Sequence, residues 1–218
     1  MTIDYTQARE NMVEQQIRPW DVLDFRVLDV LTRLPREAFV SEAYKSVAYA
    51  DIEIPLAEGR RMMKPVIEGR MLQALNLQPG EDVLEVGTGS GFATACMAAL
   101  AREVVSVEID PTLAAQARAN LDATGLGSNV RIETADIFSW QSERRFDVIC
   151  LTGAVDQLPL QLLSLLRPNG RLFVVRGRDP VMEAVLVRGD ANAPQIESLF
   201  ETEIAYLDGA APVPAFKF

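Results

Sequence analysis

The feature that most constrains the fold of this sequence is a glycine-rich segment between an apolar run and an apolar helical stretch. Residues 85–91 read Glu-Val-Gly-Thr-Gly-Ser-Gly, the apolar run covers 82–86, and the helical stretch covers 92–101. Glycines at such a turn let the backbone approach a ligand closely, and the helix that follows points its free N–H groups at that ligand. A strand, a glycine-rich turn and a helix in this order predict the first unit of an open α/β sheet.

The chain beyond this loop continues to alternate between short apolar runs and helical patterns. Further strands are expected over 103–109, 129–135, 146–152 and 171–175, and helices over 111–123 and 158–166. Such alternation implies right-handed crossovers, so we predict an α/β fold with a doubly wound, mostly parallel sheet. Residues 181–188 and 199–207 are expected to add strands at one edge, and the proline-rich residues 211–218 are expected to be irregular.

The first 64 residues have a different, mostly helical pattern. One face of the first predicted helix carries the apolar residues Ala8, Met12, Val13 and Ile17. A second helix is expected to run from an N-cap at Asp21 to Leu34, whereas residues 50–64 lack periodicity and are expected to be irregular. We therefore predict an N-terminal helical cap over residues 1–64 and an α/β domain over residues 65–218, together forming one compact unit.

The sequence contains no histidine, which excludes many catalytic devices. It rules out a Ser-His-Asp or Cys-His arrangement, an imidazole general base and a His-ligated zinc site. No acidic cluster has the spacing of a metal site, so no metal is expected.

The net charge of −10 disfavours nucleic acid as a partner, because affinity for phosphates comes mainly from Lys and Arg. No apolar run approaches membrane-spanning length and no secretion signal is recognisable, so we expect a cytoplasmic protein without a membrane partner.

Acidic residues at the ends of three predicted strands indicate the class of ligand. A dinucleotide site uses Gly-x-Gly-x-x-Gly, whereas this loop is Gly-x-Gly-x-Gly and follows Glu85, whose charge would repel a pyrophosphate. Glu85 suits the ammonium of an amino-acid moiety, Glu108 suits a pair of ribose hydroxyls, and Asp136 suits an adenine edge. We therefore predict S-adenosylmethionine as the ligand, with a nicotinamide dinucleotide as the weaker alternative.

Four N-terminal pieces of the sequence accompany the glycine-rich loop at residues 83–92: MVEQQI at 12–17, RVL at 26–28, PREAFV at 35–40 and AYAD at 48–51. Together they resemble the protein-L-isoaspartate O-methyltransferases over nearly the whole chain. The resemblance implies a Rossmann-like methyltransferase fold and carboxyl O-methylation of L-isoaspartyl residues in proteins or peptides, a protein-repair reaction. S-adenosyl-L-methionine would be the cofactor and S-adenosyl-L-homocysteine the product. The implied cofactor-binding residues are Glu85, Gly87, Thr88, Gly89, Ser90, Gly91, Glu108, Ile109, Asp136 and Ile137.

The part of the sequence expected to face the methyl acceptor departs from the family pattern. The family carries Thr-Ile-Ser, a spacer residue and Pro shortly before the cofactor loop, and here these positions hold Arg61-Met62-Met63-Lys64-Pro65. Both hydroxyl groups are therefore absent. Near the C-terminus the family's Phe-Val-Pro-Leu is present only as Pro212-Val213-Pro214-Ala215. The residues expected to face the acceptor, three of them from an acceptor-side loop at the end of the cap, are Arg61, Met63, Lys64 and Thr152.

A carboxylate acceptor agrees with the absence of histidine. A carboxylate is ionised at neutral pH and needs no general base, whereas an amine or hydroxyl acceptor would need one. Arg61 is expected either to hold a carboxylate with two hydrogen bonds or to be an exposed cation without that role. Three alternatives stay open: a methyltransferase for a different, small-molecule acceptor, a cofactor-binding protein without turnover, and a nicotinamide oxidoreductase.

Overall fold

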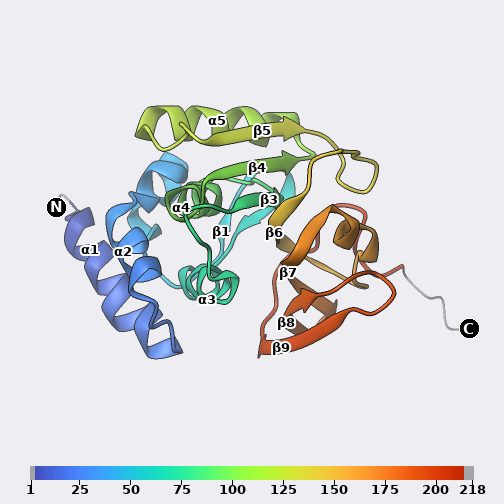
Figure 1. Cartoon of the computed structure of the whole chain (residues 1–218). Coiled ribbons are helices and arrows are strands. Elements are labelled where there is room, and N and C mark those ends of the chain that lie inside the picture. The colour runs from blue at the N-terminus through green and yellow to red at the C-terminus, as the bar shows by residue number, and fades with distance from the viewer. Residues whose placement is uncertain (1–2, 214–218) are drawn as a thin grey trace, which may run out of the picture.

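A seven-stranded sheet lies at the centre of the molecule (Figure 1) in the computed structural model, which describes residues 3–213 apart from the side chain of Glu58. The strands follow the order β5-β4-β3-β6-β7-β8-β9. Their bounds are β3 Asp82–Val86, β4 Glu103–Glu108, β5 Val130–Thr134, β6 Phe146–Val155, β7 Leu166–Arg178, β8 Val181–Arg188 and β9 Gln195–Glu201. Strands β3 to β7 run parallel to one another, whereas β8 is antiparallel to β7 and β9 is antiparallel to β8 at one edge. The predicted mostly parallel, Rossmann-like sheet is therefore confirmed.

The direction in which strands are added reverses at β3. This strand pairs with β4 on one side and with β6 on the other, so the chain builds one half of the sheet before it returns for the other half. In sheets of this kind a ligand binds beyond the carboxyl ends of the strands, at the point of reversal. The glycine-rich loop follows β3 directly and therefore lies at that point.

Three helices cover one face of the sheet: α3 (Pro65–Leu75), α4 (Phe92–Leu100) and α5 (Pro111–Thr124). Asp110 caps α5 by accepting a hydrogen bond from the backbone N–H of Thr112 at 2.7 Å, as the Asp-Pro sequence predicts. Loops and the short 3-10 helix η6 (Leu160–Leu165) cover the other face. The helix expected over 158–166 is thus shorter than predicted, because β7 already begins at Leu166.

The N-terminal residues form a further layer of helices against α3 and α4 (Figure 1). Its elements are α1 (Tyr5–Met12), the π-helical turn η1 (Val13–Ile17), η2 (Arg18–Trp20), α2 (Phe25–Arg33), η3 (Arg36–Phe39) and η4 (Glu42–Val47). The N-cap expected at Asp21 is wrong, because Asp21 has a left-handed φ of 61° and Asp24 caps α2 instead. The side chain of Gln73 on α3 holds the turn between them by accepting a hydrogen bond from the N–H of Leu23 at 2.6 Å. That long-range contact leaves no signal in the local sequence.

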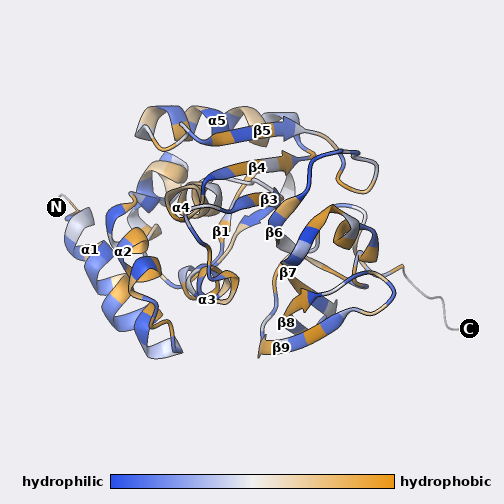
Figure 2. Ribbon diagram, in the orientation of Figure 1, coloured by the Kyte–Doolittle hydropathy of each residue, from blue (hydrophilic) through white to orange (hydrophobic). Residues whose placement is uncertain are grey.

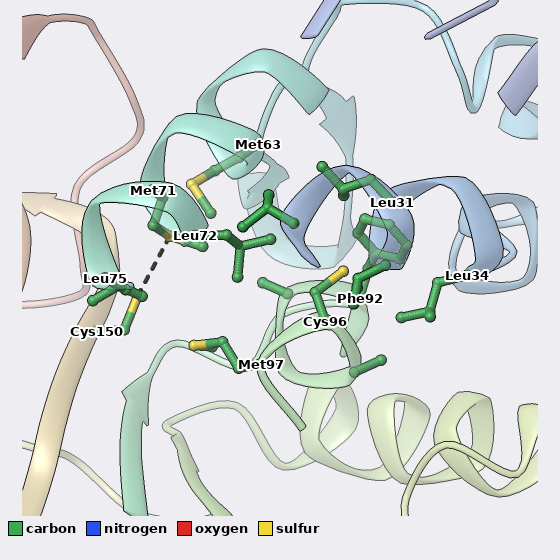
Figure 3. Close-up of a cluster of buried hydrophobic side chains, with 14 of the residues drawn as sticks. Leu31, Leu34, Met63, Met71, Leu72, Leu75, Phe92, Cys96, Met97 and Cys150 are labelled. Carbon is green, nitrogen blue, oxygen red and sulfur yellow. Dashed lines mark hydrogen bonds between the residues drawn. The ribbon is translucent and has the colours of Figure 1, made fainter. Parts of the chain in front are cut away.

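The helical cap and the sheet share one hydrophobic core (Figure 3). Leu31 of α2, Leu72 of α3 and Met97 of α4 are fully buried in it. On the sheet side, the Sγ of Cys150 lies 3.4 Å from the Sδ of Met71. Figure 2 shows the corresponding alternation of apolar and polar residues along α2. One core spans both predicted parts of the chain, and the boundary between residues 64 and 65 stays a prediction.

The segment 50–64, expected to be irregular, contains a small hairpin. Strands β1 (Ile54–Pro55) and β2 (Arg61–Met62) pair antiparallel, and the 3-10 turn η5 (Ala57–Gly59) joins them. The N–H of Leu56 donates to the carbonyl oxygen of Arg60 at 2.8 Å and closes the turn. Two-residue strands are too short to show an alternating pattern, so sequence periodicity could not reveal them.

The strand expected over 199–207 is wrong in its bounds, because β9 ends at Glu201. The chain then leaves the sheet edge and returns to β6, where Tyr206 forms an isolated parallel bridge with Ala154. Residues 214–218 of the expected irregular tail, including part of Pro212-Val213-Pro214-Ala215, lie outside the described residues. Within residues 3–213, no helix has both the length and the apolar character that a bilayer crossing requires.

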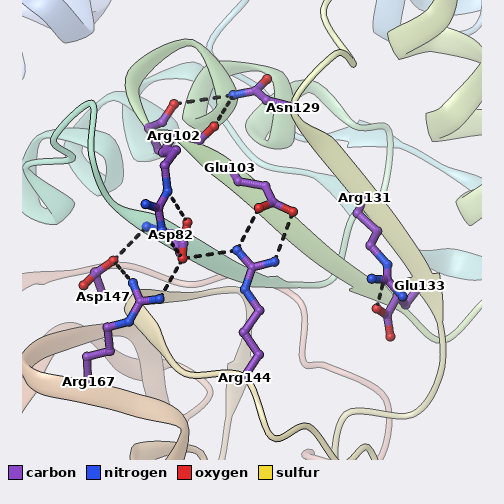
Figure 4. A network of polar contacts seen from close by, with 10 residues as sticks. Asp82, Arg102, Glu103, Asn129, Arg131, Glu133, Arg144, Asp147 and Arg167 are labelled. Atoms are coloured by element: carbon purple, nitrogen blue, oxygen red, sulfur yellow. Dashed lines mark hydrogen bonds and ion pairs between the residues drawn. The ribbon is translucent and has the colours of Figure 1, made fainter.

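A cluster of ion pairs fixes the amino ends of the parallel strands, opposite to the glycine-rich loop (Figure 4). The side chain of Asp82 on β3 is only 2% exposed, and its Oδ2 lies 2.6 Å from Arg102 and 2.8 Å from Arg167. Arg144 lies 3.2 Å from the same oxygen. Burial by itself raises the pKa of Asp82, but hydrogen bonds from the three arginines outweigh it and hold the pKa well below its usual range.

We predict that Asp82→Asn lowers the free energy of unfolding by about 2 kcal/mol or more, because three arginines lose their shared counter-charge. Since the folded state holds the pKa of Asp82 below the unfolded value of about 3.9, this stabilisation is present above pH 4 and is lost as the pH falls. Urea unfolding from pH 7 to pH 3 measures it, and the difference from wild type should shrink below pH 4. The control is Glu197→Gln at an exposed ion pair, expected to cost less than about 1 kcal/mol. Equal losses in both variants would contradict the assignment.

Candidate functional site

A pocket opens at the carboxyl ends of the parallel strands, where ligands bind in sheets of this kind. Residues at and after the strand ends form its floor: Val86, Gly87, Gly89, Val107, Glu108, Ile109, Ala135, Asp136, Ile137, Thr152 and Gly153. Two segments cover it from either side, one containing Glu53, Leu56, Arg60, Arg61 and Met63 and the other spanning residues 204–208. The pocket is thus built from regions that lie far apart in the sequence.

Several residues predicted to bind the cofactor converge on this pocket: Gly87, Gly89, Glu108, Ile109, Asp136 and Ile137. They follow or end three neighbouring strands, β3, β4 and β5. This convergence follows from the parallel order, because the carboxyl ends of parallel strands share one edge of the sheet. Their contact with a ligand stays a prediction, but the structure gives all of them access to the same pocket.

The glycine-rich loop is held by hydrogen bonds at a conformation that favours glycine. Gly87 has a φ of +92°, and its N–H donates to the carbonyl oxygen of Val107 at 2.9 Å. A Cβ on Gly87 would lie 2.6 Å from Oγ1 of Thr152, so no larger residue fits without displacement. Gly89 has a φ of +54°, and a Cβ there would lie 3.3 Å from Leu56 on the covering segment. The absent side chains leave the loop backbone open towards the pocket.

Glu108 connects the loop to the next strand of the sheet. Its Oε2 accepts a hydrogen bond from the N–H of Gly89 at 2.9 Å, and its Oε1 accepts one from the N–H of Asp110 at 3.0 Å. The side chain is 3% exposed and lines the pocket. Each carboxylate oxygen has a second lone pair, so Glu108 retains the capacity to accept hydrogen bonds from a ligand that carries paired hydroxyl groups.

Asp136 and Ile137 form the third part of the floor, after β5. Asp136 is exposed, and its Oδ1 accepts a hydrogen bond from the N–H of Phe138 at 2.9 Å. Ile137 is 7% exposed and also lines the pocket. A carboxylate beside an apolar side chain suits a flat heterocycle with polar edge groups, because the apolar side chain packs on the ring and the carboxylate accepts from its edge.

Glu85 lies beneath the loop and does not belong to the residues that line the pocket. It is fully buried, and its Oε2 accepts hydrogen bonds from Thr94 and Ser106, both at 2.5 Å. Its Oε1 has no hydrogen-bond partner among the described residues. Burial raises the pKa of Glu85 to about 8, although the two hydroxyl donors lower it. The structure places Glu85 beneath the loop and outside the pocket lining. Its direct contact with an ammonium group therefore stays a prediction.

Three other predicted loop residues also lie outside the pocket lining. Thr88 is buried, with its Oγ1 2.6 Å from Oγ of Ser106. Ser90 faces a separate hollow beside η3, and Gly91, with a φ of +86°, packs against Ala117 of α5. All three contribute to the shape of the loop, and their predicted contact with the cofactor stays a prediction.

Among the residues expected to face the acceptor, Arg61, Met63 and Thr152 line the pocket, whereas Lys64 lines an adjoining hollow. Met63 is 6% exposed and packs beside α3 in the shared core (Figure 3). The hydroxyl of Thr152 donates to the carbonyl oxygen of Val86 at 2.9 Å and is therefore already engaged. Arg61 is the one of these three that presents an exposed polar group.

The two covering segments contain pocket residues that the sequence analysis missed. Arg60 lies 3.0 Å from Asp110 at the start of α5 and also pairs closely with Asp208, so one guanidinium joins both covering segments to the floor. Leu207 packs against Gly87 and Gly153. The sequence analysis expected an irregular segment over 50–64 and a strand over 199–207. Neither expectation indicates these contacts, because the contacts depend on tertiary pairing.

The sequence and the fold of this chain are similar to those of known proteins. Residues 7–208 match the family described as Protein-L-isoaspartate(D-aspartate) O-methyltransferase. A protein from Marinobacter nauticus named Protein-L-isoaspartate O-methyltransferase 2 is 40% identical over 184 residues, 84% of either chain. One from Syntrophotalea carbinolica named Protein-L-isoaspartate O-methyltransferase is 40% identical over 80% of this chain and 81% of its own. A Plasmodium falciparum crystal structure, described as such a methyltransferase in complex with S-adenosyl-L-homocysteine, has a TM-score of 0.80 at 21% identity, covering 94% of this chain and 99% of its own.

We predict that Glu85→Gln makes stability less dependent on pH. The folded pKa of Glu85 is about 8 and the unfolded value about 4.3, so folding takes up a proton between these values. The free energy of unfolding should therefore fall as the pH rises from about 4.5 to 8, and Gln at this position removes that contribution. Chemical unfolding of the ligand-free protein at pH 5 and pH 8 measures the slope.

Part of the slope should persist in this variant, because burial also raises the pKa of Glu68 to about 7. The matched control is Glu10→Gln on the exposed surface of α1, which should leave the slope unchanged. A slope in Glu85→Gln as steep as that of wild type would contradict a neutral Glu85 in the folded protein.

Proposed function

The chain belongs to the protein-L-isoaspartate O-methyltransferase family, and we propose that it methylates the free carboxylate of L-isoaspartyl residues in proteins or peptides. It is a methyltransferase that uses S-adenosylmethionine. The observation that carries the proposal is the pocket at the carboxyl ends of β3, β4 and β5, with the glycine-rich loop and Glu108 on its floor. A family match over residues 7–208 includes both this floor and the acceptor-side segment.

The residues present fit this cofactor in three respects. Gly87 and Gly89 provide a floor that a Cβ would obstruct. Glu108 has lone pairs available for the ribose hydroxyls, and Asp136 stands beside Ile137 where an adenine ring would be recognised. These residues together would hold the cofactor.

Methyl transfer to a carboxylate requires the protein mainly to align the methyl donor and the acceptor. When bound, the cofactor supplies an activated methyl group, whose carbon forms a bond to a lone pair of the acceptor oxygen while its bond to sulfur breaks and that electron pair stays on sulfur. No proton moves, because the acceptor carboxylate is already ionised at neutral pH. The protein must hold the acceptor in line, and such positioning supplies much of the rate acceleration in reactions between two substrates.

The two covering segments support this role by bringing apolar side chains to the loop. Leu56 lies near Gly89, and Leu207 lies near Gly87 and Gly153. Apolar surroundings strengthen the electrostatic contacts within a site. The absence of a histidine base is then no obstacle, and methylation of an altered aspartyl residue as the start of protein repair is the reaction we propose.

The direct test is methyl transfer from labelled S-adenosylmethionine to a short peptide that contains one L-isoaspartyl residue. The control is the same peptide with a normal aspartyl residue, in which the side-chain carboxylate stands at a different distance from the backbone. We expect turnover on the isoaspartyl peptide alone. Tight binding of S-adenosylhomocysteine without any turnover would refute the proposed acceptor, and tighter binding of NAD would refute the cofactor.

We further predict that Glu108→Gln weakens binding of S-adenosylhomocysteine by about 10-fold or more. The amide keeps the side-chain volume but loses the negative charge and one of the two acceptor oxygens, which removes charge-assisted hydrogen bonds of about 1.5–3 kcal/mol. Calorimetric titration measures the change. Glu197→Gln, on the distant β9 edge, is the matched control and should bind like wild type. An unchanged affinity in a folded Glu108→Gln variant would exclude Glu108 from the cofactor site.

A further inference from the structure

A second hollow opens beside the cofactor pocket and shares a wall with it. The residues that line both are Glu53, Arg61, Ile204, Ala205 and Tyr206. The remaining lining residues of the second hollow are Lys64, Asp179, Met182 and Glu203. A peptide acceptor needs a place beside the cofactor that is open to solvent and rich in polar groups, and this hollow provides both.

Arg61 is the cation common to the two hollows, whereas Lys64 lines only the second. The side chain of Arg61 is 55% exposed, and among the described residues its one ion pair is with Glu53, with 3.5 Å between Nη1 and Oε2. That distance is longer than the 2.7–2.9 Å of a well-formed charge-assisted hydrogen bond. The neighbouring Arg60, by contrast, is engaged by two carboxylates. Most of the hydrogen-bonding capacity of Arg61 is therefore available.

The backbone around Arg61 is held by the β1–β2 hairpin and by a hydrogen bond from Arg36. Arg61 pairs with Pro55 in the β1–β2 hairpin, and the next residue, Met62, is buried. The carbonyl oxygen of Met63 accepts a hydrogen bond from the buried Arg36 at 2.6 Å. A long side chain on a fixed backbone can reorient towards a ligand without any change in the fold.

We propose that Arg61 binds the acceptor carboxylate and that the isoaspartyl peptide lies in the second hollow, an inference that rests on the proposed function. The planar guanidinium donates to both carboxylate oxygens and displaces the weak contact with Glu53. A carboxylate has about four lone-pair sites, so two hydrogen bonds leave lone pairs free for attack on the methyl carbon. The guanidinium of Arg61 thus takes the place of the two hydroxyls of the family's Thr-Ile-Ser pattern, which this chain lacks.

Met62, Met63, Thr152 and Glu53 cannot take this role. Met62 and Met63 have no donor and are buried in the core. The hydroxyl of Thr152 is engaged with the carbonyl oxygen of Val86. Glu53 is an acid and would repel an incoming carboxylate unless Arg61 lay between them. Lys64 lines only the second hollow, so Arg61 is the cation that faces both the cofactor pocket and the proposed acceptor site.

The test measures methyl transfer to the isoaspartyl peptide by Arg61→Gln and Arg61→Lys. Arg61→Gln should raise the KM for the peptide about 10-fold or more and change kcat by less than about 3-fold, because a clamp of this kind binds the carboxylate before and during transfer. Arg61→Lys should be intermediate, since an ammonium keeps the charge but not the two-point geometry. The matched control is Arg188→Gln, an exposed and ion-paired arginine on β8, which should behave as wild type.

A second variant tests the displacement of Glu53. Glu53→Gln removes the acid that competes for Arg61 and should lower the KM for the peptide several-fold. A higher KM would show instead that Glu53 is needed for binding and would overturn this part of the proposal. S-adenosylhomocysteine should bind Arg61→Gln within about 3-fold of wild type, and a loss as large as in Glu108→Gln would assign Arg61 to the cofactor instead.

Peptide binding separates this inference from the proposed function. Fluorescence anisotropy compares a labelled isoaspartyl peptide with its carboxamide analogue, on protein saturated with S-adenosylhomocysteine. Wild type should prefer the carboxylate, and Arg61→Gln should not. That result without any turnover would refute the proposed reaction and support the role of Arg61. Turnover with equal KM values for wild type and Arg61→Gln would support the reaction and overturn the role of Arg61.

Discussion

The buried ion pair between Arg36 and Glu68 is the contact on which the arrangement of cap, acceptor-side segment and sheet depends. Arg36 is fully buried, pairs with Glu68 of α3, and donates to the carbonyl oxygens of Ala48 at 2.8 Å and Met63 at 2.6 Å. A buried charge is tolerable only when its donors are satisfied, and here each acceptor belongs to a different segment. Burial raises the pKa of Glu68 to about 7, and the charge of Arg36 counteracts it. The pair therefore requires these segments to assemble together.

The two ends of the parallel strands use carboxylates in opposite ways. At the amino ends, Asp82 is enclosed by arginines and serves only to hold strands together. At the carboxyl ends, Glu108 is held by backbone N–H groups and keeps lone pairs for a ligand. The first arrangement neutralises the acid, and the second leaves its charge directed at the pocket. Carboxylate side chains thus give stability at one edge of the sheet and are available for recognition at the other.

The fold was largely predictable because its signals are local. The strand bounds 82–86 and 181–188 match the structure at both ends, since an apolar run between turn residues needs no distant partner to be recognised. The floor of the pocket followed from the parallel order. The covering segments did not, because Arg60 and the return of residues 204–208 to β6 depend on contacts across the whole chain. The burial of Glu85 could not be predicted either, because the sequence pattern is the same for an acid buried beneath a loop and for one that contacts a ligand.

Arg60 makes the way in which the pocket is covered sensitive to dissolved salt. A single partly buried guanidinium pairs with two carboxylates that lie far apart in the sequence, Asp110 at the start of α5 and Asp208 on the second covering segment. Exposed ion pairs weaken as dissolved salt rises. The link that Arg60 makes between the covering segments and the start of α5 is therefore expected to loosen as the ionic strength rises.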